Sequence, residues 1–569
     1  MSSIIFKDIN SNDIQGLIIS NLPPISKPQV RTEITEIEGL DGDIVDEVGY
    51  KAYDKTISIS LTRNYDINNI IKYFSGKGNL VLSNEPDKIY KASIYKQIDY
   101  ERLIRFKTAN VTFHVQPYKY LKDEKYSTAE KETITGNSII INDGIKVCKN
   151  TVYGNSIQNG EPTPDNIVDI VNIGSNGFLT EKIVSKNLYN DATKKSDYYV
   201  NNNGVETSNI NYEVSEYIKV YGYDYISLSG NTYIKPSHAS KVCFYDKNKN
   251  FVSYEDIAQG NNKYQVPSDA KYVRISIRKG DIIQLEVGDT TEYEKHQENI
   301  VKVNLKENEL CKIGDIKDEL DVVSGILTKR VGKVVFNGSE KWVASGAAVN
   351  VGVKAYSLTG IVDTIKGIND SNGYSNHFQV VIGGENWGTT EHKNSGYYRF
   401  ASNNLYIRIS ETLGSTLDDF KNWLSNNNVV IYYELAQPEI IQLEKNDMKL
   451  YKPSHIDIDS EVQPSNVEIE YFKEYEVENK GLEDSKPIIH IKGEGTIYLK
   501  VNGQTSFIYR FDDSKEVYID CDEQEAYLNG TLKNRNMQGD FPTLKSGINT
   551  IEWTGTITDI EILAKSRWL

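Results

Sequence analysis

The residues that could do chemistry are few and widely spaced in this sequence of 569 residues. None of its seven histidines has a partner at the spacing of a metal site or a catalytic pair. It contains no G-x-S-x-G elbow, no H-E-x-x-H, no P-loop and no G-x-G-x-x-G loop. The sequence therefore predicts no catalytic residues, no metal and no cofactor.

The cysteines also lack a reactive pattern, because none lies close enough to another for a C-x-x-C motif. They are too few to hold together a disulfide scaffold of this length. We expect reduced thiols that are either buried or incidental. The four are Cys148, Cys243, Cys311 and Cys521.

Two segments match part of a binding motif. Gly493–Gly495 begins like a dinucleotide-binding loop, but Tyr498 stands where the third glycine belongs, so we expect a β-turn between strands. Asp246–Asn250 begins like a calcium loop, but the sixth position is Phe251 and the twelfth is Ile257. A polar hairpin tip is the better interpretation of that segment.

Trp387 is the best candidate for contact with a sugar ring. It lies in the loop Gly383–Thr390, where flanking glycines would allow the indole to present its face to a pyranose. The alternative is a loop tryptophan folded back onto the core, because tryptophan is usually buried. His392 and Tyr374 flank the same region and are further carbohydrate-binding candidates.

Length and composition limit the classes of protein that could carry these residues. The length suggests about four domains. Lys and Arg number 64 against 80 Asp and Glu, a net charge of −16, which argues against a nucleic-acid coat or a binder of anionic membranes. No apolar run approaches a membrane span, and no secretory signal is visible, so we expect synthesis in the cytoplasm without membrane insertion. The 39 tyrosines favour β structure.

The first 120 residues predict a β domain with one helix. Ile57–Leu61 and Val111–Val115 alternate as half-buried strands do. Between them, Asp66 can cap a helix whose apolar residues recur at i, i+3, i+4 and i+7. That apolar stripe consists of Ile67, Ile70, Ile71 and Phe74.

The remaining residues also predict strands. In residues 480–569, Asn502-Gly503 between two alternating runs predicts a hairpin, and the strand spacing suits a sandwich. The middle, 126–466, is rich in Asn, Ser and Gly and divides near residue 298, with one helix near Thr416–Leu424.

Read together, the two ends resemble the distal tail proteins of phages with long, flexible tails and of related tail-like particles. The resemblance covers about residues 1–125 and 470–569. Its most specific parts are the stretch Gly539–Pro542, Asn549, the pair Arg567-Trp568 and the segment Gln116-Pro117-Tyr118. Longer matching runs are Glu36–Leu61, Val111–Tyr120, Pro487–Gly503 and Glu525–Gly555.

The resemblance implies a mainly β fold in four parts. These are an N-terminal ring-forming domain with one helix (1–125), inserted β-sandwich modules 126–298 and 299–466 similar to carbohydrate-binding modules, and a C-terminal galectin-like β-sandwich (467–569). Segments of the insertion recur in tail and receptor-binding proteins of phages with Gram-positive hosts. They are Asn159–Gly174, Val242–Ser253, Ser268–Gly288 and Val430–Pro438.

The function that this resemblance implies is structural. The chain would form a ring with itself, usually a hexamer, and join the tail tube protein to the tail-tip hub or tail-associated lysin at the virion tail tip. The insertion would bind a host cell-surface glycan, with no sequence-specific binding of nucleic acid. Alternatives are an insertion that degrades polysaccharide, a secreted adhesin, and an insertion that only spaces or docks another tail protein.

Overall fold

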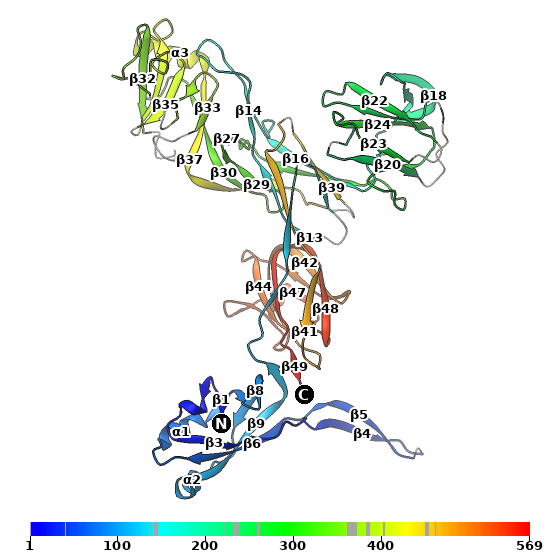
Figure 1. The fold of residues 1–569 in the computed structure, drawn as a ribbon, viewed down its shortest axis with the longest axis vertical. Coiled ribbons are helices and arrows are strands. Elements are labelled where there is room, and N and C mark those ends of the chain that lie inside the picture. Colours follow the sequence, from blue (N-terminus) through cyan, green and yellow to red (C-terminus); the bar gives the residue numbers. More distant parts are fainter. Residues whose placement is uncertain are drawn as a thin grey trace. The chain divides into compact units, whose positions relative to one another are not determined.

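The computed structural model divides the chain into two compact units, residues 1–130 with 472–569, and residues 131–471 (Figure 1). It describes residues 2–39, 41–136, 138–141, 146–220, 222–230, 237, 239–258, 262–360, 372–382, 387–401, 404–449, 454–460 and 462–569. Strands dominate, so the predicted mainly β class is confirmed. The α-helices of the described part are α1 (Ile67–Tyr73), α2 (Tyr100–Phe106) and α3 (Leu417–Asn427).

The first β domain is built on one antiparallel sheet with strand order β2-β1-β7-β8-β9-β6-β3. Alternating apolar residues of its strands fill one core with Ile57, Ile59, Val111 and Phe113 at its centre. The strands are β1 (Ile4–Phe6), β2 (Ile9–Asn10), β3 (Leu17–Asn21), β6 (Tyr53–Leu61), β7 (Gly76–Leu82), β8 (Glu85–Ile94) and β9 (Thr108–Leu121).

Helix α1 begins as predicted, because the Asp66 side chain accepts a hydrogen bond from Asn69 N at 3.2 Å. The predicted apolar stripe is partly wrong. Ile70 and Phe74 are buried, but Ile71 is 41% exposed and Tyr73 takes its place in the core. The domain also holds a second short helix, α2, which Asp99 caps by accepting from Arg102 N at 2.8 Å.

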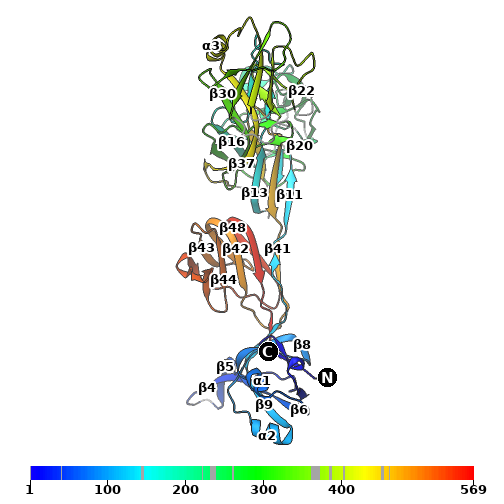
Figure 2. The same ribbon diagram turned by 90° about the vertical axis from the view of Figure 1, so that its left-hand side faces the viewer.

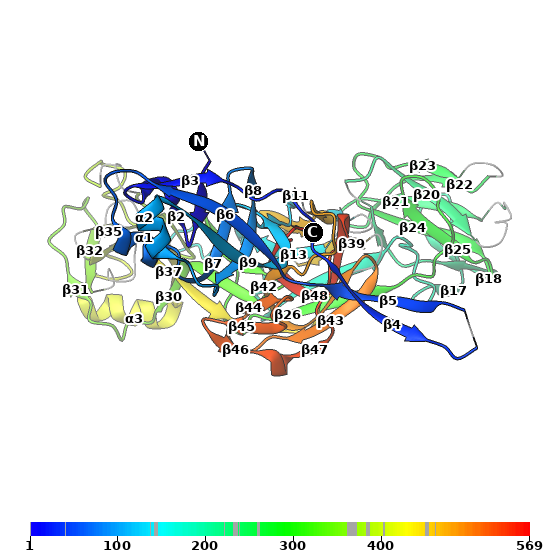
Figure 3. The same cartoon turned by 90° about the horizontal axis from the view of Figure 1, so that it is seen from below.

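A long hairpin extends from this domain (Figure 3). Its strands, β4 (Val30–Glu36) and β5 (Asp43–Tyr50), pair with each other and with no other described strand. Both strands are exposed along most of their length.

The C-terminal domain is organised around two long antiparallel strands, β42 (Ile488–Val501) and β48 (Gly547–Leu563) (Figure 2). The first half of β42 pairs with β44 (Glu516–Asp520) and its second half with β43 (Gln504–Arg510), so the two halves extend the sheet differently. Further strands are β10 (Ser127–Thr128), β41 (Tyr475–Asn479), β45 (Glu525–Leu528), β46 (Thr531–Leu532) and β47 (Met537–Gly539).

The expected β-turn at Gly493–Gly495 is wrong, because these residues form an irregularity inside β42. A Cβ at Gly493 would lie 2.4 Å from Thr556 O, so the two strands approach too closely for any side chain there. The segment lies within an antiparallel strand and not before a helix, unlike a dinucleotide loop. The Asn502-Gly503 hairpin is confirmed, since Val501 pairs with Gln504 and both turn residues have positive φ.

The last residues of the chain pack on the first domain. Strand β49 (Arg567–Trp568) pairs with β9 through Arg567 and Tyr120. Ser566 N and Oγ donate to the Glu124 carboxylate at 2.8 and 2.5 Å. The Lys88 Nζ atom lies 3.7 Å from the centre of the Trp568 ring.

The larger sheets that the structure describes within residues 131–471 form three groups, each with its own core. One group combines the orders β11-β40-β13-β29-β30-β37-β33 and β12-β39-β16-β26-β38. These strands come from both sides of residue 298, where β26 (Glu298–Asn304) begins, and the four-part division stays a prediction. The others are β11 (Lys131–Thr135), β12 (Ser138–Ile141), β13 (Lys146–Tyr153), β16 (Phe178–Ser185), β29 (Glu319–Asp321), β30 (Ile326–Phe336), β33 (Gly373–Ser375), β37 (Val429–Gln442), β38 (Glu444–Lys445), β39 (Ser454–Asp459) and β40 (Asn466–Phe472).

The second group lies within residues 187–289. Its sheets have the orders β17-β18-β24-β21-β22 and β23-β20-β25. The predicted hairpin tip is confirmed, because Asp246 Oδ1 accepts from Asn248 N and Asn250 N at 2.8 Å each. The strands are β17 (Lys195–Val200), β18 (Glu206–Val214), β20 (Tyr225–Gly230), β21 (Lys241–Tyr245), β22 (Phe251–Asp256), β23 (Lys263–Gln265), β24 (Tyr272–Arg278) and β25 (Ile283–Val287).

The third group holds the sheet β31-β32-β36-β35-β34 and helix α3. This helix lies where the sequence predicts one. Thr416 and Asp419 form a capping box at its start, and the helix packs Phe420 and Leu424 into the core. Phe420 stacks on Tyr356 with 4.2 Å between ring centres. The strands are β31 (Val343–Ala344), β32 (Val353–Thr359), β34 (Gln379–Val380), β35 (Tyr397–Ala401) and β36 (Asn404–Ser410).

Candidate functional site

A pocket of about 450 Å³ lies on the sheet that contains β35 and β36. Residues 345–347 line it together with Trp387, Arg399, Ala401 and Tyr406. We call it the Trp387 pocket.

Strand alternation places its polar residues. Along β35 and β36, Tyr398, Phe400, Leu405, Ile407 and Ile409 are buried in the core with α3. The residues between them must point to the opposite face, because successive side chains of a strand alternate. That face carries Arg399 opposite Tyr406, and Tyr397 opposite Arg408. The two arginines are therefore diagonal neighbours on adjacent strands, within reach of long side chains.

Arg408 fastens the loop that carries Trp387 to this face. Its Nη1 donates to Trp387 O at 2.8 Å and to His392 O, and its Nη2 donates to Ala348 O at 2.7 Å. The guanidinium lies 3.7 Å from the centre of the Trp387 ring. Arg408 is only 1% exposed, so it is a structural cation beneath the indole.

The loop has further internal support. Asn350 Nδ2 donates to Thr390 O at 2.8 Å and to Asn394 Oδ1 at 2.7 Å. The His392 ring packs edge-on against Tyr397, with 5.2 Å between centres. These contacts connect residues 387–394 to the rest of this group of strands; residues 383–386 of the predicted loop lie outside the described residues.

The pocket is positively charged. Burial, followed by the nearby charge of Arg399, lowers the pKa of Arg408 to about 10, so this group stays protonated at neutral pH. Arg399 forms no hydrogen bond or ion pair within the described residues, and its Nε is buried without a partner. The site thus offers a free guanidinium beside an indole ring.

The predicted sugar-binding residues separate into two places. Trp387 and His392 lie together through Arg408. Tyr374, on β33, packs instead with a cluster that includes Cys311, Val331 and Tyr432. The carbohydrate-binding role of all three stays a prediction.

Sequence reasoning missed Arg399 and Arg408. The signal was an arginine inside each of the apolar strands YYRFA and LYIRIS. A charged residue within such a run, on the face away from the core, indicates that this face either lies under a loop or binds a ligand.

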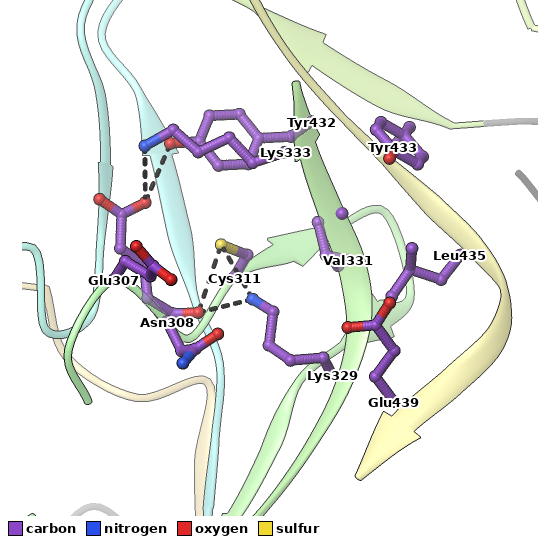
Figure 4. A pocket seen from close by; sticks show the side chains of 12 residues that line it. Glu307, Asn308, Cys311, Lys329, Val331, Lys333, Tyr432, Tyr433, Leu435 and Glu439 are labelled. Atoms are coloured by element: carbon purple, nitrogen blue, oxygen red, sulfur yellow. Dashed lines mark hydrogen bonds and ion pairs between the residues drawn. The ribbon is translucent and has the colours of Figure 1, made fainter. Parts of the chain in front are cut away.

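A second pocket, of about 390 Å³, is lined by residues that include Cys311, Val331 and Tyr432 of the cluster against which Tyr374 packs (Figure 4). Each of its two lysines is paired with a carboxylate. Lys329 Nζ donates to Asp318 Oδ2 at 2.6 Å and to Glu309 O at 2.7 Å. The Glu309 carboxylate accepts from Tyr432 at 3.0 Å and pairs with Lys333 at 3.4 Å.

Asp318, beside this second pocket, stabilises the local backbone. Its carboxylate is fully buried and accepts from the backbone N atoms of Cys311, Arg330 and Val331 at 2.8, 2.7 and 3.0 Å. The last two bonds fix the register shift between Lys329 and Val331 in β30. Burial raises the pKa of the Cys311 thiol to about 12, which keeps it protonated.

All four cysteines are buried and free, as expected. Within the described residues, no three His, Cys, Asp or Glu side chains gather in a way that could hold a metal ion. No helix among those residues has the length and apolar character to cross a membrane.

Comparison with known proteins gives the class of the C-terminal domain. Residues 480–568 match the family described as "Siphovirus-type tail component, C-terminal domain". The match covers the β42–β48 domain and confirms there the resemblance to distal tail proteins. The similarity to siphovirus-type tail components therefore holds for residues 480–568 of the chain.

A solved structure is also similar. It is that of the SPP1 Dit (gp 19.1) protein, titled a paradigm of the hub adsorption apparatus in phages infecting Gram-positive hosts. The alignment covers 52% of this chain and 99% of the other at 9% identity, with a TM-score of 0.18. No curated protein matches the chain.

Proposed function

We propose that the protein is a tail component of the siphovirus type and acts structurally at the tail tip. The unit formed by residues 1–130 and 472–569 would assemble into a ring, a hexamer as is usual in the family that the ends resemble. The ring would join the tail tube protein to the tail-tip hub. The family match of residues 480–568 is the observation that carries this proposal.

The β4–β5 hairpin supports self-assembly. A two-stranded hairpin is marginally stable alone in water. This one exposes Ile34, Ile44 and Val45 at 60%, 43% and 52%. A neighbouring copy in a ring would cover these side chains and pair the free strand edges.

Residues 131–471 would carry the host-binding function. The Trp387 pocket supports a glycan ligand, because it combines an aromatic ring with polar side chains on a rigid sheet. The three groups of sheets give this unit its own cores, as a displayed module requires.

Two measurements test the proposal. We expect the full chain and a version lacking residues 131–471 to form rings in negative-stain images. Light scattering should give the same number of copies per ring for both. A full chain that stays monomeric at high concentration, without rings, contradicts the ring.

The glycan part is tested separately by sedimentation of the full chain with host cell walls. Binding that is lost in Trp387→Ala supports the module's role if it is kept in the control Trp423→Phe, which changes a tryptophan of helix α3 outside the loop. Release of soluble sugars from the walls would instead indicate a degradative enzyme.

A further inference from the structure

We propose that the Trp387 pocket binds an anionic sugar unit, one that carries a carboxylate or a phosphate beside its hydroxyl groups, with Arg399 as the residue that binds the anion. This inference rests on the proposed glycan-binding function and adds the charge class of the ligand.

The first argument is the charge balance of the pocket. Two guanidinium groups occupy one face of neighbouring strands, and no ion pair joins either to a carboxylate in the described part of the chain. The chain as a whole has a net charge of −16, so this local surplus of positive charge runs against its composition. Bringing two cations together at a partly buried surface is costly, and a bound anion would offset that cost.

The two arginines have different tasks. Arg408 uses Nη1 and Nη2 on three backbone carbonyl oxygens, so it fixes the loop and is not available to a ligand. Arg399 lines the pocket and forms no hydrogen bond within the described residues, so its donors remain available. A guanidinium suits this role because its planar fork can donate two parallel hydrogen bonds to a carboxylate or phosphate.

The other lining groups suit a sugar. Arg408 covers the Trp387 ring from the side of the sheet, and the indole also lines the pocket, where it offers apolar surface to a sugar ring. Tyr406 Oη accepts from Asn404 Nδ2 at 3.0 Å, which leaves its own hydrogen to donate to a ligand. Residues 345–347 complete the lining.

The second pocket is a useful contrast in the same unit. There Lys329 and Lys333 are already paired, with Asp318 and Glu309. An anion would have to displace a carboxylate from either lysine. The unpaired arginines therefore distinguish the Trp387 pocket from a polar pocket that only stabilises the fold.

The test measures binding of three small probes to the full chain by titration calorimetry: methyl glucuronide, glucose 1-phosphate and neutral methyl glucoside. We expect the two charged probes, or one of them, to bind more tightly than the neutral one, with affinity that falls as salt rises. Binding by only the first or only the second would assign the anion to a carboxylate or a phosphate. No binding by either charged probe at millimolar concentration overturns the proposal.

Variants locate the anion. Arg399→Gln should weaken the charged probe about tenfold to a hundredfold, the range expected for losing hydrogen bonds to a charged group. The control is Arg278→Gln, which removes an exposed arginine from β24 in the same unit and should change nothing. Equal affinity in the two variants overturns the assignment, and Arg399→Lys tests whether the fork is needed beyond the charge.

Cell-wall binding shows whether the glycan-binding proposal or only the anionic inference is wrong. If the full chain binds no host wall material, the proposed glycan function fails. If wall binding persists unchanged in Arg399→Gln, the glycan function stands and the anionic inference fails. Thermal unfolding of each variant shows whether it is folded.

Discussion

Glu181 gives a sharp test of the energetics of the central sheets. It lies on β16, is fully buried, and accepts a hydrogen bond from Asn150 Nδ2 at 2.6 Å through Oε1. Its Oε2 has no partner within the described residues. Burial, reinforced by the charges of Asp457 and Asp321, raises the pKa of this carboxyl to about 7.

The raised pKa makes the folded state bind a proton more tightly than the unfolded state does. The stabilisation is fully present below the ordinary pKa of 4.5 and is lost as the pH rises through about 7. A difference of this size corresponds to roughly 3 kcal/mol. Glutamine resembles the protonated acid, so we expect Glu181→Gln to be more stable than the parent at pH 8 by up to about that amount, relative to their difference at pH 4.

The assay is urea unfolding of the full chain at pH 4, 6 and 8, followed by tryptophan fluorescence. Three of the five tryptophans lie in residues 131–471, where they report on this unit. Glu216→Gln is the control, because Glu216 is exposed in the same unit and its removal should have a small effect at every pH. A difference between Glu181→Gln and the parent that stays constant from pH 4 to pH 8 would refute the reasoning.

Three further perturbations have expected outcomes. Burial lowers the pKa of His455 to about 4, so the stability that its neutral form contributes is lost as the pH falls from 6.5 through 4. The parent should therefore lose roughly 3 kcal/mol of unfolding free energy over this range that His455→Gln does not lose. Acid unfolding curves that are the same for both proteins would contradict this. Asp318→Asn leaves Lys329 beside a neutral group and should lower the free energy of unfolding of residues 131–471 in urea by about 3–5 kcal/mol. A loss below about 1 kcal/mol would show that the Asp318 carboxylate is not needed for stability. Gly493→Ala places a Cβ against Thr556 O and should lower stability by about 1–3 kcal/mol, measured as a lower Tm of the C-terminal domain; an unchanged Tm would mean that the two strands separate at little cost.

Local signals predicted the local structure well. Asp66, Thr416 and Asn502-Gly503 carry information within a few residues, because caps and tight turns depend on their immediate neighbours. Each lies at the helix start or turn that its sequence pattern indicates. The mainly β class followed from the same alternation and composition.

Features that depend on distant strands were not predicted. Ile71 and Tyr73 exchange places in the core because the orientation of α1 is set by the sheet beneath it. The close approach at Gly493 depends on β48, more than fifty residues further along the chain. Tyr374 is close to Trp387 in sequence, but β33 pairs with β37, which takes Tyr374 into another cluster.

The candidate site needed the pairing of β35 with β36, since neither arginine means much alone. Only the register places Arg399 and Arg408 on the same face of adjacent strands. The sequence indicated Trp387, the aromatic residue of the site. It did not indicate the two arginines, because each lies within an apolar strand.

Two buried cations in the same unit show how a structural charge differs from a binding charge. Lys329 is neutralised by Asp318, and that carboxylate also holds three backbone N–H groups, so the pair and the local backbone are stabilised together. Arg408 is held by carbonyl oxygens, which accept from its Nη1 and Nη2 but leave its positive charge. Arg399, beside it, adds a second charge without a carboxylate among the described residues. A fold that needed only rigidity could use the first arrangement at both places; the second arrangement keeps a positive potential at the surface, where a ligand of opposite charge can use it.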